Sequence, residues 1–368
     1  MKPMKPIAVI GAGGYVGARL VERSELLGQP PLVPIARSWH SEGRVARFGL
    51  RMVRGNASDA ASLTPVLAGC GMAVNVTAGD DDRIVSDAKA IYAACTDAGV
   101  PLLVHMSTAE VFGRAEDPGM TEDSAPRGRH WMKYGRAKAE AEAWLRSQSA
   151  APVAVVILRP GLIWGPGSTW LTGPAQTLLD GTAFLFNEGR GICNLIHVDN
   201  LIEHLMQLAL DDHVESAVYN IADHETLTWS DYYRAIACEI GVETSTVTML
   251  PESAFRENTV GNLLHTLAKQ PPAKAVKRRL SSDTKLRIKK GLRELRSPPA
   301  TASRLIVPQP AVTKQMWWIQ GTSRKLPSGA FAQRYPDLAL HPFAELMASA
   351  GEWLRYAGFD RTVYPEPR

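Results

Sequence analysis

A short apolar run near the start of the chain ends abruptly in glycines, and this stretch constrains the fold more than any other. After Ile7 to Ile10, Gly11, Gly14 and Gly17 follow at three-residue intervals, and a helix-compatible segment comes next. We interpret the order as strand, tight turn and helix. In this order Gly14 lets backbone amides approach a phosphate, and Gly17 lets the helix pack closely on the strand. The unpaired amides at the helix start attract a pyrophosphate, so the stretch predicts a dinucleotide site. The alternative is an ordinary strand-to-helix turn.

Further apolar runs alternate with helical patterns along the first 225 residues. A helix is expected from about residue 15 to Leu27, ended by Gly28, and another from Arg83 to Ala98, ended by Gly99. The expected strands are Leu32–Ala36, Leu50–Val53, Met72–Val76, Pro101–Met106, Val153–Leu158 and Ala217–Ala222. Strands and helices that alternate in this way form parallel βαβ units with helices on both faces. The prediction is an α/β fold with a doubly wound parallel sheet.

The length of the chain predicts two lobes. With 368 residues and 45% hydrophobic residues, it has enough apolar side chains for one large core and a smaller one. We assign residues 1–165, completed by about 192–225, to a dinucleotide-binding domain. Residues 166–191 and 226–368 are assigned to a smaller, mostly C-terminal substrate lobe.

Net charge, cysteine spacing and hydropathy indicate which partners and which cellular compartment to expect. A net charge of +4 is too mild to predict nucleic acid as a partner of the whole protein. Four cysteines without paired spacing predict neither a zinc site, nor any other metal site, nor a disulfide framework, and they fit a reducing cytosol. Residues 1–6 are too short and polar for a secretory signal, and no apolar run reaches the length of a membrane span. We therefore expect a cytoplasmic protein.

The end of the second expected strand bears on which dinucleotide is bound. NAD sites usually place a carboxylate there for the ribose 2′-hydroxyl, whereas this chain has Ala36, Arg37 and Ser38. An arginine and a hydroxyl can hold a 2′-phosphate instead, so NADP(H) is favoured and NAD(H) stays the alternative. We expect Asn56 and Ala57 to border the adenine. Small residues at Thr77 and Ala78 would let the backbone lie against the cofactor.

A tyrosine and a lysine four residues apart carry the predicted chemistry. Tyr134 and Lys138 share one face of an expected helix, and Thr108 follows the strand that ends at Met106. A phenol with a pKa of about 10 is a poor base at neutral pH unless a nearby ammonium stabilises its anion, and Lys138 would supply that charge. Thr108 would hydrogen-bond the substrate oxygen that Tyr134 protonates or deprotonates, while a nicotinamide carries the hydride.

At this point the chain resembles a known family. The resemblance covers the chain to about residue 225 and rests on Gly11-x-x-Gly14-x-x-Gly17, Ser107-Thr108-x-Glu110-Val111-Phe112-Gly113, Tyr134-x-x-x-Lys138, Leu158-Arg-Pro-Gly-Leu-Ile-Trp-Gly-Pro166 and Ile196-His-Val-Asp199-Asn200-Leu201. These motifs resemble the short-chain dehydrogenases/reductases, in particular the extended group with NAD-dependent epimerases and dehydratases. The resemblance implies a Rossmann domain with a smaller substrate lobe, and a catalytic triad of Thr108, Tyr134 and Lys138. The expected cofactor-binding residues are Gly11, Gly13, Gly14, Tyr15, Val16, Gly17, Arg37, Ser38, Asn56, Ala57, Thr77, Ala78, Tyr134, Lys138, Arg159 and Pro160.

Departures from the family's pattern bear on the substrate. Members that bind nucleotide sugars typically have an asparagine where this chain has Leu162, and often an arginine where it has Cys193. A diphosphate needs donors and positive charge, so both changes weaken a nucleotide-sugar assignment. Glu110 matches a residue of sugar 4,6-dehydratases, but Ala109 cannot donate a proton to a leaving hydroxyl. The expected substrate-binding residues are Glu110, Leu162, Trp164, Trp170 and Cys193, with packing beneath the second lobe as the alternative role of the two tryptophans.

These observations favour an NAD(P)-dependent oxidoreductase that interconverts a ketone or aldehyde and an alcohol on a mainly apolar small molecule. One alternative is a nucleotide-sugar epimerase or dehydratase that uses the nicotinamide transiently. Another is a non-catalytic dinucleotide-sensing protein. The basic segment 269–296 is interpreted either as a solvated insertion or as a peripheral contact with anionic lipid or an acidic partner. Members of the family often dimerise through two helices of the first lobe, so a homodimer is also open.

Overall fold

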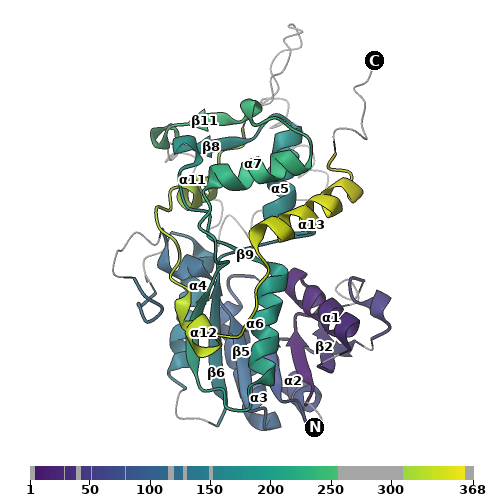
Figure 1. Ribbon diagram of the computed structural model, residues 1–368. Coiled ribbons are helices and arrows are strands. Elements are labelled where there is room, and N and C mark those ends of the chain that lie inside the picture. Colours follow the sequence, from purple (N-terminus) through teal and green to yellow (C-terminus); the bar gives the residue numbers. More distant parts are fainter. Residues whose placement is uncertain are drawn as a thin grey trace, which may run out of the picture.

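The computed structural model describes residues 5–28, 30–38, 43–50, 52–78, 80–114, 120–126, 131–148, 152–255 and 310–360. Two lobes are visible in Figure 1, a larger one built on a sheet and a smaller one above it. The basic segment 269–296 lies outside the described residues. Within the described ranges, no helix is both long enough and apolar enough to cross a membrane.

A seven-stranded parallel sheet forms the larger lobe. Its strand order is β10-β6-β5-β4-β1-β2-β3, and every pairing in it is parallel. The strands are β1 (Ile7–Ile10), β2 (Leu32–Ala36), β3 (Val53–Arg54), β4 (Met72–Asn75), β5 (Leu102–Met106), β6 (Ala154–Pro160) and β10 (Ala217–Ile221). The order reverses between β1 and β4, and ligands of open α/β sheets bind outside the carboxyl ends of the strands at such a point.

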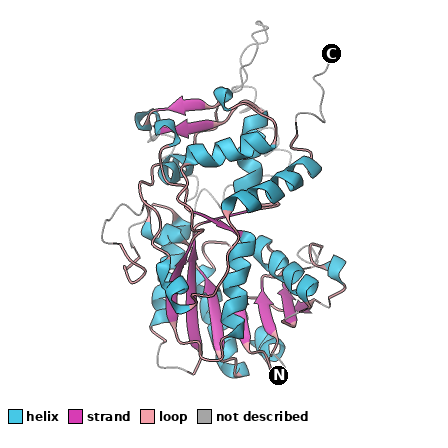
Figure 2. Cartoon of the chain, in the orientation of Figure 1, coloured by secondary structure: helices cyan, strands magenta, loops and turns pink. Residues whose placement is uncertain are grey.

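Helices cover both faces of this sheet (Figure 2). One apolar core cluster joins the sheet to α1 (Tyr15–Leu27) and α6 (Val198–Leu210). A second cluster joins the other face to α2 (Ala60–Leu67), α3 (Ile84–Ala98) and α4 (Lys133–Arg146). The predicted doubly wound α/β fold is confirmed.

Local sequence signals account for most of these boundaries. Gly28 and Gly99 end α1 and α3 in the left-handed conformation, with φ of 70° and 68°. The Asp59 carboxylate caps α2 by accepting from the backbone N–H of Ser62. The third predicted strand, Leu50–Val53, is placed wrongly, because only Val53 and Arg54 pair with β2. This strand lies at the sheet edge, where one partner instead of two gives a weak sequence signal.

The smaller lobe has its own apolar core, which includes Trp164, Trp229 and Tyr232. Its elements are β7 (Leu162–Trp164), α5 (Thr169–Leu179), β8 (Phe184–Phe186), β9 (Leu195–His197), α7 (Trp229–Glu239), β11 (Thr248–Leu250), α11 (Lys314–Gln320) and α13 (Phe343–Tyr356). β7 pairs with β9 and β8 pairs with β11, both in parallel.

Short 3-10 helices occur in both lobes. They are η2 (Ala46–Phe48), η3 (Ala109–Phe112), η4 (Asn187–Gly189), η5 (Thr244–Thr246) and η6 (Glu252–Ala254).

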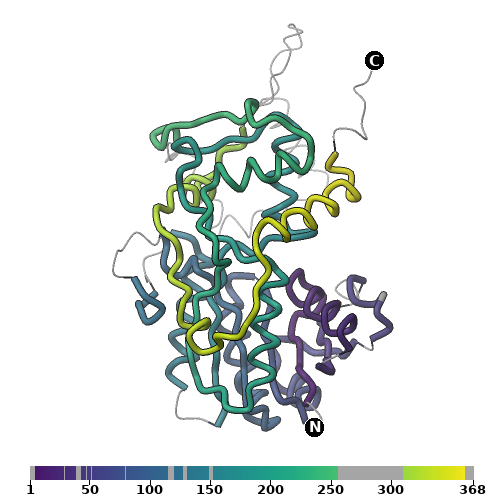
Figure 3. Tube along the Cα trace, viewed as in Figure 1, coloured from purple at the N-terminus to yellow at the C-terminus, as the bar shows by residue number. Residues whose placement is uncertain are grey.

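The described C-terminal segment runs along both lobes, as the yellow tube in Figure 3 shows. From α11 in the smaller lobe it descends to α12 (Gly329–Arg334) beside β10, then returns to α13. Phe331 and Tyr335 are 1% and 8% exposed, and they belong to the apolar core cluster that includes α1 and α6. This part of 226–368 therefore packs on the dinucleotide-binding side, whereas the other predicted domain boundaries stay predictions.

Candidate active site

The glycine turn lies at the switch point of the sheet, between β1 and α1. Gly11 has a φ of +98°, a conformation that favours glycine. The backbone N–H of Gly14 donates to the Gly11 carbonyl oxygen at 2.9 Å. A Cβ on Gly17 would lie 2.4 Å from that same oxygen, so only glycine allows the helix this close to the turn. Gly17 therefore supports the turn from behind, whereas Gly11, Gly13 and Gly14 line a cleft.

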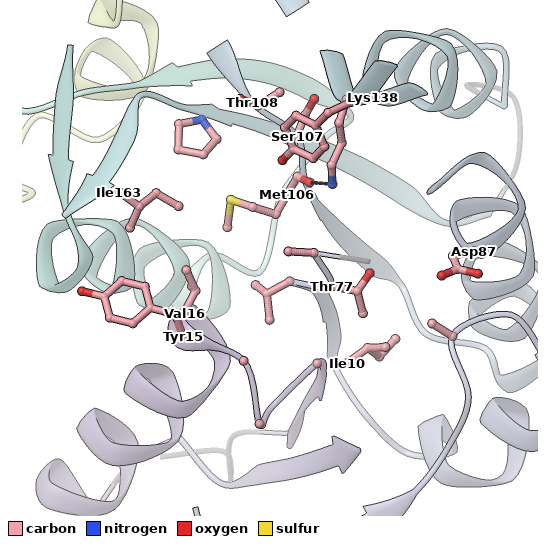
Figure 4. Close-up of a pocket in the computed structure, with 18 of the residues that line it drawn as sticks. Ile10, Tyr15, Val16, Thr77, Asp87, Met106, Ser107, Thr108, Lys138 and Ile163 are labelled. Carbon is pink, nitrogen blue, oxygen red and sulfur yellow. Dashed lines mark hydrogen bonds between the residues drawn. The ribbon is translucent and has the colours of Figure 1, made fainter. Parts of the chain in front are cut away.

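This cleft has a volume of about 670 Å³ and begins at the carboxyl ends of β1, β2, β4 and β5. In Figure 4, Tyr15 and Val16 stand at the start of α1 on one side, and Met106, Ser107, Thr108 and Lys138 gather at the end of β5. The first amides of α1 have no intrahelical acceptor and favour an anion at this point. The turn and the predicted catalytic residues thus share one cleft.

One end of the cleft is rich in arginines. Arg37, directly after β2, and Arg44, in the loop that follows, are both exposed and both line it. Arg44 was not predicted, although it stands only seven positions beyond Arg37. Ser38, which was predicted to contact the cofactor, does not line the cleft.

The remaining walls of this end come from the loops after β3 and β4. Asn56, Ala57, Thr77 and Ala78 all line the cleft, where the sequence placed them. The Asn75 side chain accepts from the backbone N–H of Thr77 at 3.1 Å and from its hydroxyl at 2.7 Å, which orders the loop after β4. All four side chains are short, so the loops approach the cleft without filling it.

The predicted catalytic residues meet at the other end. Thr108 is 9% exposed, Lys138 is 3% exposed, and Tyr134 is half-buried on the cleft wall. The Thr108 hydroxyl oxygen accepts from the backbone N–H of Glu110 at 3.2 Å, which leaves its proton to donate elsewhere. The Lys138 ammonium donates to the Met106 carbonyl oxygen at 2.7 Å (Figure 4) and lies 5.9 Å from the centre of the Tyr134 ring.

The ionisation of this group differs from the sequence prediction. Burial, followed by the charges of Glu110 and Asp81, raises the pKa of Tyr134 to about 12. Burial lowers the pKa of Lys138 to about 8, and Glu142 opposes that shift. The predicted lowering of the phenol pKa by Lys138 is wrong for the protein without ligand, because burial dominates and the ammonium is held by Met106. The phenol is therefore protonated at neutral pH.

Arg159, a predicted cofactor contact, is fully buried behind the cleft and does not line it, which corrects that prediction. Its Nη2 lies 2.6 Å from Glu142 Oε2, and both side chains are 0% exposed. The Ser107 hydroxyl donates to the same carboxylate. The neighbouring Pro160 does line the cleft. Arg159 thus serves the packing of β6 against α4.

Two predicted substrate contacts, Trp164 and Cys193, lie in the core of the smaller lobe, which for Trp164 is the alternative packing role and for Cys193 is a correction. Trp164 is 0% exposed and its indole N–H donates to Asp223 at 3.1 Å, while Cys193 is 3% exposed in the same core. Leu162, Trp170 and Glu110 line the cleft, and their contact with a substrate stays a prediction. Sequence analysis missed further lining residues, namely Met132, Ile163, Ser168, Thr169 and Gln315, of which Gln315 comes from the distant α11.

The His197-Val-Asp199 motif supports the site from outside it. The backbone N–H of Asp199 donates to His197 Nδ1 at 3.2 Å, so the imidazole caps α6. Asp199 accepts from Arg19 Nε of α1 at 2.6 Å. Neither residue lines the cleft. The motif fixes α6 against α1, the helix whose first turn faces the predicted pyrophosphate.

Comparison with known families agrees with this geometry. Residues 7–222 match the model of the NAD dependent epimerase/dehydratase family, which is more than half of the chain. The chain belongs to this family. As a member of the epimerase/dehydratase family it is an NAD(P)-dependent enzyme of the extended short-chain dehydrogenase/reductase group.

Among curated relatives in this group, a 2-alkyl-3-oxoalkanoate reductase of Stenotrophomonas maltophilia is 27% identical over 72% of this chain and 86% of its own length. A 4-hydroxy-2-methyl-3-oxo-4-farnesyl-3,4-dihydroquinoline-1-oxide ketoreductase of Stigmatella aurantiaca is 25% identical over 58% of this chain and 67% of its own.

Solved structures of the epimerase/dehydratase family share the fold. The dTDP-glucose 4,6-dehydratase DesIV of Streptomyces venezuelae, solved with NAD and TYD bound, has a TM-score of 0.67 at 18% identity, covering 98% of this chain and all of its own. WbmG of Bordetella bronchiseptica, solved with NAD and UDP, has a TM-score of 0.65 at 17% identity, covering 99% of both chains.

Proposed function

We propose that this chain is an NADPH-dependent reductase of ketones on apolar small molecules, of the 3-oxoalkanoyl type with an alkyl branch at carbon 2. The observation that carries the proposal is the meeting of Thr108, Tyr134 and Lys138 at one end of a cleft that also holds the glycine turn. The relatives named for the reduction of 2-alkyl-3-oxoalkanoate and for ketoreduction support this choice of reaction.

The cleft suits an adenine dinucleotide phosphate. A Cβ at Gly14 would lie 3.2 Å from the Gly11 carbonyl oxygen, so the bare backbone leaves the first turn of α1 accessible to a pyrophosphate. Arg37 and Arg44 would hold a 2′-phosphate through charge-assisted hydrogen bonds. The described residues that follow β2 carry no carboxylate to repel that phosphate. These features favour NADPH over NADH.

The raised pKa of Tyr134 supports reduction as the direction of chemistry. The nicotinamide, when bound, supplies a hydride to the ketone carbon, and negative charge then develops on the ketone oxygen. Tyr134 is protonated at neutral pH and gives its proton to that oxygen. The Thr108 hydroxyl, whose oxygen already accepts from the N–H of Glu110, donates a hydrogen bond to the same atom. Lys138 then stabilises the phenolate that remains.

The substrate walls are mainly apolar. Met106, Met132, Leu162, Ile163 and Trp170 contribute side chains that suit alkyl groups. Nucleotide sugars need donors and cations for their diphosphate. The described part of this end offers one cation, Lys138, and its ammonium is bound to a carbonyl oxygen. The composition therefore favours a ketone reductase over a nucleotide-sugar epimerase or dehydratase.

The proposal is tested by following NADPH absorbance with a panel of 2-alkyl-3-oxo compounds whose two chains vary in length. We expect one NADPH to be oxidised per secondary alcohol formed, with kcat/KM rising with chain length. NADPH binding without turnover of any member of the panel would contradict the proposal.

A further inference from the structure

A glutamine of the smaller lobe lines the substrate end of the cleft. Gln315 belongs to α11 and shares this wall with Leu162, Ile163 and Trp170. It is exposed, and within the described part of the chain no hydrogen bond joins its side-chain amide to another residue. That amide carries two N–H donors and one acceptor oxygen. Gln315 therefore presents unused hydrogen-bonding groups beside mainly apolar walls.

Aromatic contacts hold α11 beside the start of α4, whose first turn carries Tyr134. The Lys314 ammonium lies 4.9 Å from the centre of the Trp131 ring, and the Trp318 ring meets Trp131 edge to face at 6.1 Å. Lys314 and Trp318 are four residues apart, so the helix face that they share rests on Trp131. Gln315 is one position further on, about 100° around the helix, and its side chain lines the cleft.

A second anchor fixes α11 to the segment that follows η3. The Arg114 guanidinium lies 4.2 Å from the centre of the Trp317 ring, and its Nη2 donates to the Trp317 carbonyl oxygen at 3.4 Å. η3 begins directly after Thr108. The two anchors thus tie Gln315 to the elements that carry Thr108 and Tyr134, the two groups that are proposed to bind the ketone oxygen.

A 2-alkyl-3-oxo compound has a second oxygen function close to the reacting ketone. Its carbon 1 is a carboxylate in the acid and an acyl carbonyl in an ester, and both are hydrogen-bond acceptors. One carbon separates carbon 1 from the ketone carbon, so the two oxygens lie within about 5 Å of each other. An acceptor that enters the cleft loses bonds to water, and the Gln315 amide supplies donors that replace them.

Two hydroxyl groups also line this end of the cleft. The Ser168 hydroxyl donates to the Ile163 carbonyl oxygen at 2.7 Å and caps α5, so its proton is already used. Thr169 is exposed, and its hydroxyl forms no hydrogen bond to another described residue. It lies on α5, which has no part in the two anchors of α11. Thr169 therefore serves as the comparison for Gln315.

We propose that Gln315 is a specificity-determining residue that donates a hydrogen bond to the carbon 1 oxygen of a 2-alkyl-3-oxo acid or its ester, and so places the ketone at carbon 3 against Thr108 and Tyr134. The inference rests on the proposed function and refines its substrate class to ketones with an acceptor at carbon 1. It assigns Gln315 no part in proton or hydride transfer.

The test compares three substrates at neutral pH: a freshly prepared 2-alkyl-3-oxo acid, its methyl ester, and the ketone that decarboxylation of the acid leaves. Initial rates of NADPH oxidation give kcat and KM for each. Gln315→Met keeps the length and the helix preference of the side chain and removes its donors. We expect kcat/KM to fall about tenfold for the acid, about threefold for the ester and not at all for the ketone, because charged acceptors form stronger hydrogen bonds. The loss should lie in KM, since ground state and transition state share this bond.

Gln315→Glu separates the acid from the ester by charge. A carboxylate at this position repels the ionised acid, so kcat/KM for the acid should fall about fivefold below its value in Gln315→Met. The ester should give similar values in the two variants. Equal values for the acid in the two variants would overturn the inference.

Gln333 provides a matched control. It is exposed on α12 and is not among the described residues that line the cleft, so Gln333→Met should leave all three substrates unchanged. Thr169→Val should cost the acid less than Gln315→Met does. A larger cost in Thr169→Val, or an equal loss for the acid and the ketone in Gln315→Met, would overturn the inference. Absence of turnover of all three substrates by the wild-type enzyme would instead overturn the proposed function, and this inference with it.

Discussion

The two ends of the cleft recognise their ligands by different means. At one end, bare backbone at the glycine turn and the exposed Arg37 and Arg44 offer donors and positive charge. At the other, Thr108, Tyr134 and Lys138 are set among apolar walls, and burial is the largest influence on the pKa values of Tyr134 and Lys138. The first end suits an anion of fixed shape. The second suits an apolar substrate and is proposed to transfer one proton.

The largest effect is expected from Tyr134→Phe, which removes the proton at the second end alone. Ketone reduction should fall about 10³-fold, within the range attributed to general acid catalysis. NADPH affinity, measured by fluorescence titration, should change little. Thr108→Val, which removes one hydrogen bond to the ketone oxygen, should cost less, about 10- to 100-fold. Full turnover in Tyr134→Phe would place the proton donor elsewhere.

A smaller effect is expected at the first end. Replacing Arg37 or Arg44 by Ala should weaken NADPH binding about tenfold each, since each removes a charge-assisted contact with the 2′-phosphate. NADH binding should change less than twofold, and the NADPH loss should shrink at high salt because both side chains are exposed. Calorimetry with both cofactors measures this. Equal losses of affinity for NADH and NADPH would mean that these arginines do not bind the 2′-phosphate.

The smallest effect concerns stability. Burial raises the pKa of Glu110 to about 7 from the ordinary value of 4.5, so the fold disfavours its charged form. The contribution of Glu110 to the free energy of unfolding is therefore fully retained below pH 4.5, and it is lost as the pH rises through 7. Glu110→Gln should therefore raise the free energy of unfolding by about 2 kcal/mol at pH 8.5, discounted for partial exposure, and leave it unchanged at pH 4.5. Urea unfolding at the two pH values would contradict this if the variant gained nothing at pH 8.5.

The first end was largely predictable from the sequence because its chemistry is local. The glycine spacing and the missing carboxylate directly after β2 each depend on a few consecutive residues. Helix ends at Gly28 and Gly99 follow from the same local rules. Arg44 was missed because only the fold shows which residues of the loop after β2 turn toward the cleft.

The second end was less predictable because distant segments decide it. Trp164 and Trp170 look alike in the sequence, yet Trp164 packs against Phe343 and donates to Asp223 while Trp170 reaches the cleft. Arg159 was assigned to the cofactor, but Glu142 of α4 holds its side chain behind the cleft. The direction of the Tyr134 pKa shift likewise depends on burial, which spacing alone does not give.

The central claim is that a hydride leaves the cofactor at the second end and stays in the product. The most direct measurement uses NADPH deuterated at the transferred position with a 2-alkyl-3-oxo ester. We predict one deuterium on the carbinol carbon of the alcohol and one NADP⁺ formed per alcohol. A product without deuterium and a cofactor returned unchanged would contradict the account and favour transient use of the nicotinamide.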